Sequence, residues 1–133
     1  MGLIRSEDNI KKTIDFSGLF DDKEEKRTGS DIDFYWEDGE KVIYVEVKTQ
    51  GYHILKGQRI ALERFVDNNT LFKKSIAVVV WDKQNNPTKA DLKDCIVQYY
   101  YYNGKWQIDK EHHVFKKFFR NYIGKPLAED KEN

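Results

Sequence analysis

This 133-residue sequence has little cysteine, no long apolar run and no excess of either charge. Its single cysteine, Cys95, excludes an internal disulfide, and the polar segment from Met1 to Lys12 lacks the apolar core of a secretion signal. No apolar stretch approaches the length needed to cross a bilayer. These absences favour a cytoplasmic protein without a membrane partner.

The charge of the chain is balanced, with 23 Lys and Arg residues against 23 Asp and Glu residues. An overall positive field, as in proteins that coat nucleic acid, is therefore excluded, and any contact with DNA or RNA must come from local patches. The length fits a single domain, which we expect at residues 1–126, before a polar tail at 127–133. That domain should carry the whole function.

The hydrophobic pattern predicts an α/β protein. In chain order we expect a helix, two strands, a second helix, a buried strand, a strand hairpin and a last helix. The predicted ranges are 6–14, 31–36, 41–49, 55–68, 75–81, 94–102, 105–108 and 114–123. Residues 15–28 are expected to form a loop. The dipeptides Asp38-Gly39 and Asn103-Gly104 favour tight hairpin turns, and the continuous apolar run at 75–81 indicates a strand buried on both faces.

Three charged residues on the predicted hairpin are its most informative feature. Asp33 lies on the first strand, and Glu46 and Lys48 lie two positions apart on the second. Strand side chains alternate between faces, so Glu46 and Lys48 share one side. Two carboxylates beside an ammonium are costly to bring together unless they bind a metal or an anionic substrate. Phosphodiester cleavage would use both.

The segment from Asp33 through Glu46-Val47-Lys48 to Gln58 resembles the PD-(D/E)XK nuclease superfamily, and the resemblance covers residues 29 to 81. It implies an αβββαβ restriction-endonuclease-like core, with a mixed central sheet between helices, to which this chain would add the C-terminal hairpin and helix. The implied activity is Mg²⁺-dependent endonuclease or exodeoxyribonuclease cleavage of DNA. Branched DNA and repair or recombination intermediates are among the implied substrates. The proline that usually precedes the first acid is absent, because Asp33 follows Ile32.

The resemblance also implies roles for individual residues. Asp33, Glu46 and the Val47 carbonyl would hold Mg²⁺ or Mn²⁺, which are hard cations that prefer oxygen ligands. Lys48 would stabilise the charge of the transition state and help to position the attacking water. Gln58, early in the second helix, matches a glutamine of several subfamilies. A glutamate of the first helix completes some sites of this kind, and Glu7 is the nearest candidate, with Glu24 and Glu25 as competitors.

Four basic residues near the ends of the second predicted helix could contact backbone phosphates around this centre. They are Lys56, Arg59, Lys73 and Lys74. The sequence does not distinguish DNA from RNA as the partner, and it does not distinguish a monomer from a homodimer.

Two alternatives use the same residues. Asp31 and Asp33 resemble the paired aspartates of polymerase-beta-type nucleotidyltransferases, although the Gly-Ser expected about ten residues upstream is replaced by Gly29-Ser30 directly beside the acids. A nuclease-like fold could also be a nucleic-acid-binding module without turnover. An intact set of two acids and a lysine argues against that reading, because carboxylates facing phosphate repel it in the absence of a metal.

Overall fold

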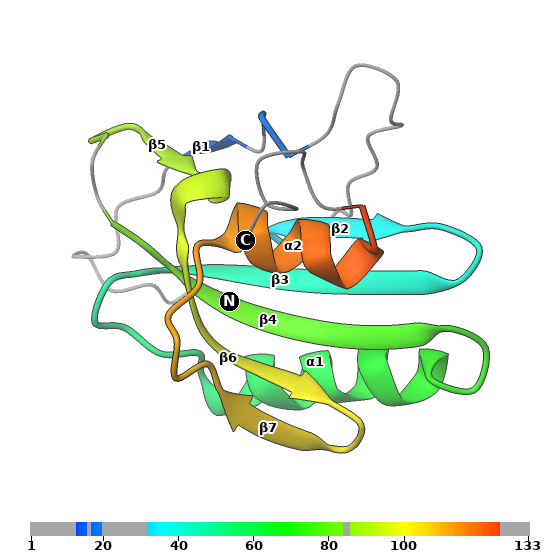
Figure 1. Ribbon diagram of the computed structural model, residues 1–133. Helices are drawn as coiled ribbons and strands as arrows, with labels where there is room; N and C mark the ends of the chain where they lie inside the picture. The colour runs from blue at the N-terminus through cyan, green and yellow to red at the C-terminus, as the bar shows by residue number, and fades with distance from the viewer. Residues whose placement is uncertain (1–12, 16, 20–31, 84–85, 126–133) are drawn as a thin grey trace.

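A five-stranded mixed β-sheet forms the centre of the computed structural model, which describes residues 13–15, 17–19, 32–83 and 86–125 (Figure 1). The elements, in chain order, are β1 Thr13–Asp15, β2 Phe34–Glu37, β3 Lys41–Thr49, α1 Lys56–Asn69, β4 Lys74–Asp82, β5 Lys89–Asp91, the short 3₁₀ helix η1 Leu92–Asp94, β6 Ile96–Tyr102, β7 Lys105–Ile108 and α2 Phe115–Ile123. Among these described residues, neither helix has the length and apolar character that a membrane-crossing helix requires.

The strand order of the central sheet is β2-β3-β4-β6-β7. Only β3 and β4 are parallel, so the chain must cross over between them, and α1 makes this crossover. The other neighbours in this sheet are antiparallel, and β6 and β7 form the hairpin predicted at Asn103-Gly104. Because β3 and β4 run the same way, their carboxyl ends meet at one end of the sheet (Figure 1).

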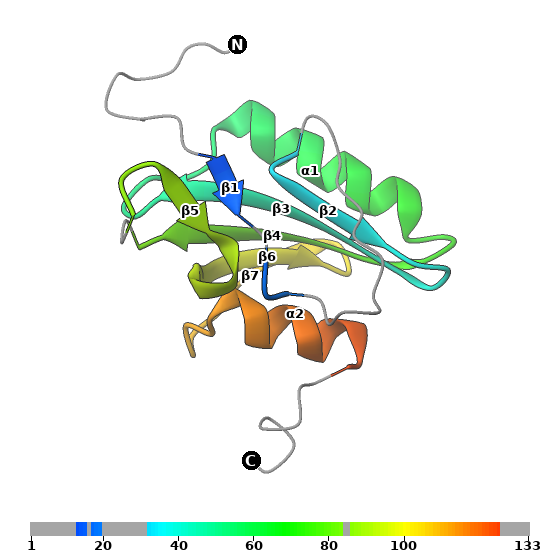
Figure 2. The same cartoon turned by 90° about the horizontal axis from the view of Figure 1, so that it is seen from above.

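The two α-helices cover opposite faces of this sheet (Figure 2). Val42 and Tyr44 of β3 pack with Leu62 and Val66 of α1. The alternate residues of the same strand, such as Ile43, pack with the aromatic side chains of α2 on the other face. β4 lies between β3 and β6 and is buried on both faces, as its apolar run predicted. The α/β class is therefore confirmed.

The N-terminal prediction was wrong where it can be compared. Thr13 and Ile14 belong to β1, which pairs in parallel with β5, and not to the end of a helix. A backbone partner more than seventy residues away overrides the local helical spacing. The predicted helix residues 6–12 and the tail at 127–133 lie outside the described residues. Ile14 packs at the margin of the core on the α2 side.

Candidate active site

Asp33 directly precedes β2, although a strand was expected to begin at residue 31. Its carboxylate Oδ2 accepts a hydrogen bond of 2.7 Å from the backbone N–H of Val47. The pairing of β2 with β3 ends at Phe34 and Val45, so this side chain provides the next acceptor where a backbone carbonyl would continue the ladder. The interaction explains both the shorter strand and the position of Asp33 beside the carboxyl-terminal half of β3.

Val47 also presents its carbonyl group toward Asp33. The N–H and C=O groups of one strand residue point to the same side of the strand. Because the N–H of Val47 is directed at the Asp33 carboxylate, the carbonyl oxygen is directed to the same side. The backbone at Val47 therefore provides one donor and one acceptor next to this acid.

Glu46 lies on the face of the sheet that α1 covers. Its Oε2 accepts a hydrogen bond of 3.2 Å from the Gln58 side-chain amide. The other end of that amide, Oε1, accepts the backbone N–H of Leu55 at 2.9 Å. Leu55 is the N-cap of α1 and has no side-chain acceptor of its own, so Gln58 satisfies a helix N–H while it orients Glu46. Both groups are partly buried.

Lys48 follows Glu46 on the same face of β3 by strand alternation. It is partly buried, and no carboxylate of the described residues forms an ion pair with its ammonium group. In the parallel register Lys48 lies opposite Trp81 of β4. The site therefore combines two carboxylates that accept hydrogen bonds from the protein with one ammonium group that the described carboxylates leave uncompensated.

The oxygen atoms at this site are suitable ligands for a hard divalent cation. The described residues contain no group of three or more His, Cys, Asp and Glu side chains placed to hold a metal. A magnesium site needs only one or two carboxylates, because the ion keeps several waters and binds substrate phosphate as well. The two acids and the carbonyl of Val47 supply oxygen ligands of that number and type.

Several predicted residues fall outside the described part of the chain. Glu7, its competitors Glu24 and Glu25, and Asp31 are all in this group. The nucleotidyltransferase alternative needs Asp31, so no observation favours it.

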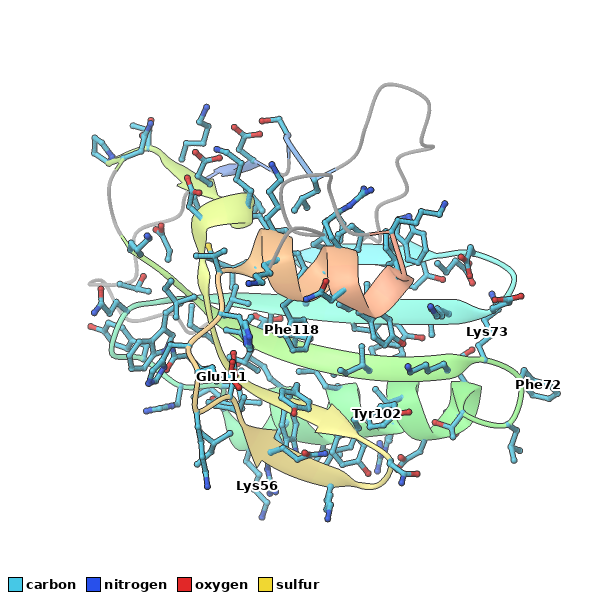
Figure 3. The ribbon with its side chains drawn as sticks, viewed as in Figure 1. Lys56, Phe72, Lys73, Tyr102, Glu111 and Phe118 are labelled. Atoms are coloured by element: carbon cyan, nitrogen blue, oxygen red, sulfur yellow. The ribbon has the colours of Figure 1, made fainter. Side chains whose placement is uncertain are left out.

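The four predicted phosphate-contacting residues occupy opposite ends of the sheet. Lys56 and Arg59 are exposed in the first turns of α1, at the same end as Gln58, and Arg59 contacts Glu63 at 3.6 Å. Lys73 and Lys74 lie where β4 begins, and Lys73 forms an ion pair with Glu37. Figure 3 shows Lys56 and Lys73 on different sides of the molecule.

Lys73 and Lys74 therefore lie far from Lys48, and their contact with backbone phosphates stays a prediction. Lys74 pairs with Lys41 while Trp81 pairs with Lys48, so seven strand residues, about 20 Å, separate the two levels of the sheet. A helix that links two parallel strands runs back along the sheet, and its C-terminal end must lie far from the carboxyl ends of the strands.

An aromatic group beside Lys48 was not foreseen from the sequence. The His53 ring lies 5.7 Å from the Trp81 ring and stacks at 6.0 Å on Tyr99. Trp106 of β7 extends the group, with its ring 5.6 Å from Tyr99. His53 belongs to the connection between β3 and α1, and no pattern in the sequence indicates which strand residues such a connection will meet.

Comparison with family models, with curated proteins and with solved structures finds no match for this chain.

Proposed function

We propose that this protein is a metal-dependent nuclease that hydrolyses phosphodiester bonds of DNA, on a core of the restriction-endonuclease-like αβββαβ type. The observation that carries the proposal is that Asp33 is bonded to the backbone of Val47, next to Glu46 and Lys48 in the chain, while Gln58 is bonded to Glu46. These residues come from three segments of the chain. They meet at the end of the sheet where β3 and β4 terminate.

Asp33, Glu46 and the Val47 carbonyl would hold Mg²⁺ or Mn²⁺. Carboxylate and carbonyl oxygens are the ligands that these hard cations prefer. When bound, the metal supplies a Lewis acid for the phosphoryl oxygen and lowers the pKa of a bound water. The backbone N–H of Val47 and the amide of Gln58 keep the two carboxylates in place before any metal arrives.

Lys48 would stabilise the negative charge that develops on the phosphorane in the transition state. An ammonium group without a carboxylate partner among the described residues keeps its full attraction for an anionic substrate. The N-terminal turns of α1 bring Lys56 and Arg59 to the same end of the sheet, where they can contact neighbouring backbone phosphates. RNA remains open as a substrate. A homodimer and a cytoplasmic location stay predictions.

The decisive experiment measures nicking of supercoiled plasmid in Mg²⁺ and in Mn²⁺, with chelator as the blank. Wild type is compared with Lys48→Ala, and with Lys117→Ala as the matched control, because Lys117 is exposed on α2 over the opposite face. We expect metal-dependent nicking by wild type and Lys117→Ala, and a loss of roughly a hundredfold or more in Lys48→Ala.

Two results would overturn the proposal. One is equal nicking by Lys48→Ala and wild type, which would assign the cleavage to a contaminant or another site. The other is the absence of cleavage of linear, flapped and four-way DNA and of RNA, with binding that is unchanged in chelator. That second result would favour a nucleic-acid-binding module without turnover.

A further inference from the structure

A pocket of about 280 Å³ lies at the same end of the sheet as Lys48. Trp81, which pairs with Lys48 in the β3–β4 register, forms part of its wall. The remaining lining residues are Gln50, Lys83, Ile96, Gln98 and His112. They come from the ends of β3 and β4, the start of β6 and the turn after β7. None of them has a role in the proposed cleavage.

The indole ring of Trp81 is held rigidly at this pocket. Its Nε1–H donates a hydrogen bond of 2.7 Å to the backbone carbonyl of Tyr52. The His53 ring lies against it at 5.7 Å, and His53 in turn stacks on Tyr99. This hydrogen bond occupies the only polar atom of the indole. A ligand in the pocket therefore meets the carbon atoms and the π surface of the ring. A fixed aromatic surface of this kind stacks planar heterocycles.

Two primary amides accompany this aromatic surface. Gln50 and Gln98 each carry a donor and an acceptor, the pair of functions that the edge of a nucleobase requires. Gln98 is the extra residue of a β-bulge, since Tyr99 pairs with Val79 while Val97 pairs with Val80. Bulges redirect a side chain and often lie next to functional sites. Among described residues, the Gln98 amide contacts only the Ile96 carbonyl, at 3.4 Å.

The turn that carries His112 is fixed by a buried carboxylate. Asp109 accepts the backbone N–H groups of Glu111 and His113, and it also contacts the His113 ring at 3.0 Å. His112 itself has a φ of 52°, a left-handed conformation that costs free energy for a residue with a side chain. The fold maintains this conformation at the wall of the pocket. Lys83 adds a positive charge at the rim.

We propose that this pocket binds one nucleobase of the strand whose phosphate is cleaved beside Lys48, with Trp81 stacking on the base, Gln50 and Gln98 bonding its edge, and Lys83 contacting an adjacent phosphate. The inference rests on the proposed nuclease function, to which it adds a subsite for a nucleotide next to the scissile bond. An apolar ligand would shield the two amides from water without bonding to them, so a heterocycle with donors and acceptors fits the lining better.

The first test measures binding of the four deoxynucleoside 5′-monophosphates to the full chain by NMR, without metal. We expect saturable shifts of the Trp81 indole N–H and of the Gln50 and Gln98 side-chain amides. Trp81→Leu should weaken binding by roughly tenfold or more, as loss of a base-stacking residue does. Lys83→Ala, which removes the proposed phosphate contact, should also weaken binding, whereas its matched control Lys105→Ala, at the far end of the β6–β7 hairpin, should bind as wild type does.

The second test scans a cleaved oligonucleotide with single abasic sites. An abasic site at one position, at a fixed distance from the scissile bond, should reduce cleavage by about tenfold. In Gln98→Leu the same abasic site should reduce cleavage by less, because the contact to the base is already weakened. Gln98→Leu also decides the NMR test if Trp81→Leu fails to fold, because its side chain is half-exposed. Mononucleotides that shift none of the three side chains would overturn the pocket assignment.

The two proposals fail in different ways. If the protein cleaves DNA, but no abasic position changes the rate and no mononucleotide binds, the nucleobase pocket is refuted and the nuclease function stands. Mononucleotide binding that Trp81→Leu and Gln98→Leu weaken, in a protein that cleaves nothing, would remove the nuclease and keep a nucleotide-binding pocket.

Discussion

The two ends of the central sheet treat charge in different ways. At the end where β3 begins, several charged and polar groups are paired with one another. Lys73 forms an ion pair with Glu37, Asp38 accepts two backbone N–H groups in the hairpin turn, and the Tyr122 hydroxyl lies within 2.9 Å of the Val42 carbonyl and 2.8 Å of the Lys74 carbonyl. Each of these contacts has a complete structural explanation.

At the end where β3 and β4 terminate, the pairing is different. Asp33 and Glu46 accept hydrogen bonds from a backbone N–H and a neutral amide. Lys48 forms no ion pair with a described carboxylate, although it is two positions from Glu46. An ammonium group without a carboxylate partner among the described residues attracts an anion. Lys48 therefore distinguishes this end of the sheet, and the proposed nuclease function would use it to bind a phosphodiester.

The largest effect is expected on the nicking rate, in a matched pair of substitutions with one at each end of the sheet. Glu46→Gln keeps the shape of the side chain and should lower the nicking rate by roughly a hundredfold or more, with no loss of folding stability. Glu37→Gln, which breaks the ion pair with Lys73, should leave the rate unchanged and cost at most about 1 kcal/mol. Plasmid nicking and urea denaturation measure both. Equal nicking rates for the two variants would erase the comparison.

The next largest effect is expected from substitution of Gln58, because its side chain bonds to both the N-cap of α1 and Glu46. Gln58→Glu keeps an acceptor for the Leu55 N–H but places a like charge against Glu46. We expect cleavage to fall about tenfold or more, as for residues that orient metal ligands, with stability near wild type. Gln58→Leu should lose activity and also about 1 kcal/mol of unfolding free energy, since the helix N–H loses its acceptor. Full activity in Gln58→Glu would contradict this role.

Local signals in the sequence were sufficient for most of the sheet. The bounds of β3 agree with the predicted strand, and β4 extends its prediction by one residue at each end. Both depend on short-range features, namely a turn dipeptide and a continuous apolar run. The common face of Glu46 and Lys48 follows from strand alternation in the same way. Gln58 was expected near the acids by resemblance, and its hydrogen bond to Glu46 brings it there.

What the sequence did not predict depends on contacts between distant segments. The pairing of β1 with β5 places Thr13 and Ile14, the last two residues of the predicted helix, in a strand. The side chain of Asp33 takes the place of a backbone carbonyl as the acceptor for the Val47 N–H, and no strand pattern in the sequence predicts this. Lys73 and Lys74 looked similar to Lys56 as cations, but the direction of the crossover helix carries them to the other end of the sheet.

Tyr122 tests the contribution to stability of the paired end of the sheet, which is the end where β3 begins. Burial raises the pKa of its hydroxyl, so the group stays protonated and can donate to the Val42 or Lys74 carbonyl. Tyr122→Phe keeps the ring at the margin of the core and removes only this donor. We expect a loss of about 1 kcal/mol of unfolding free energy in urea denaturation. The nicking rate should be unchanged, and a fall in the rate would mean that the two ends are coupled.

Asp38 gives the smallest effect and a pH signature. Burial alone would raise the pKa of its carboxyl group, but hydrogen bonds from the Glu40 and Lys41 N–H groups and the charges of Lys41 and Lys125 outweigh burial and lower it. A pKa below the unfolded value of about 3.9 means that the ionised group stabilises the fold above that pH, and that this contribution is lost as the pH falls through the folded pKa.

Asp38→Ala should therefore cost up to about 1 kcal/mol at pH 7, and the difference from wild type should narrow as the pH falls below 4. Urea denaturation of both proteins across that range measures it. A difference that stays constant down to the lowest pH would show that the turn depends on the shape of the side chain and not on its charge. In that case the paired end would owe its order to packing, and only the end with Lys48 would be governed by charge.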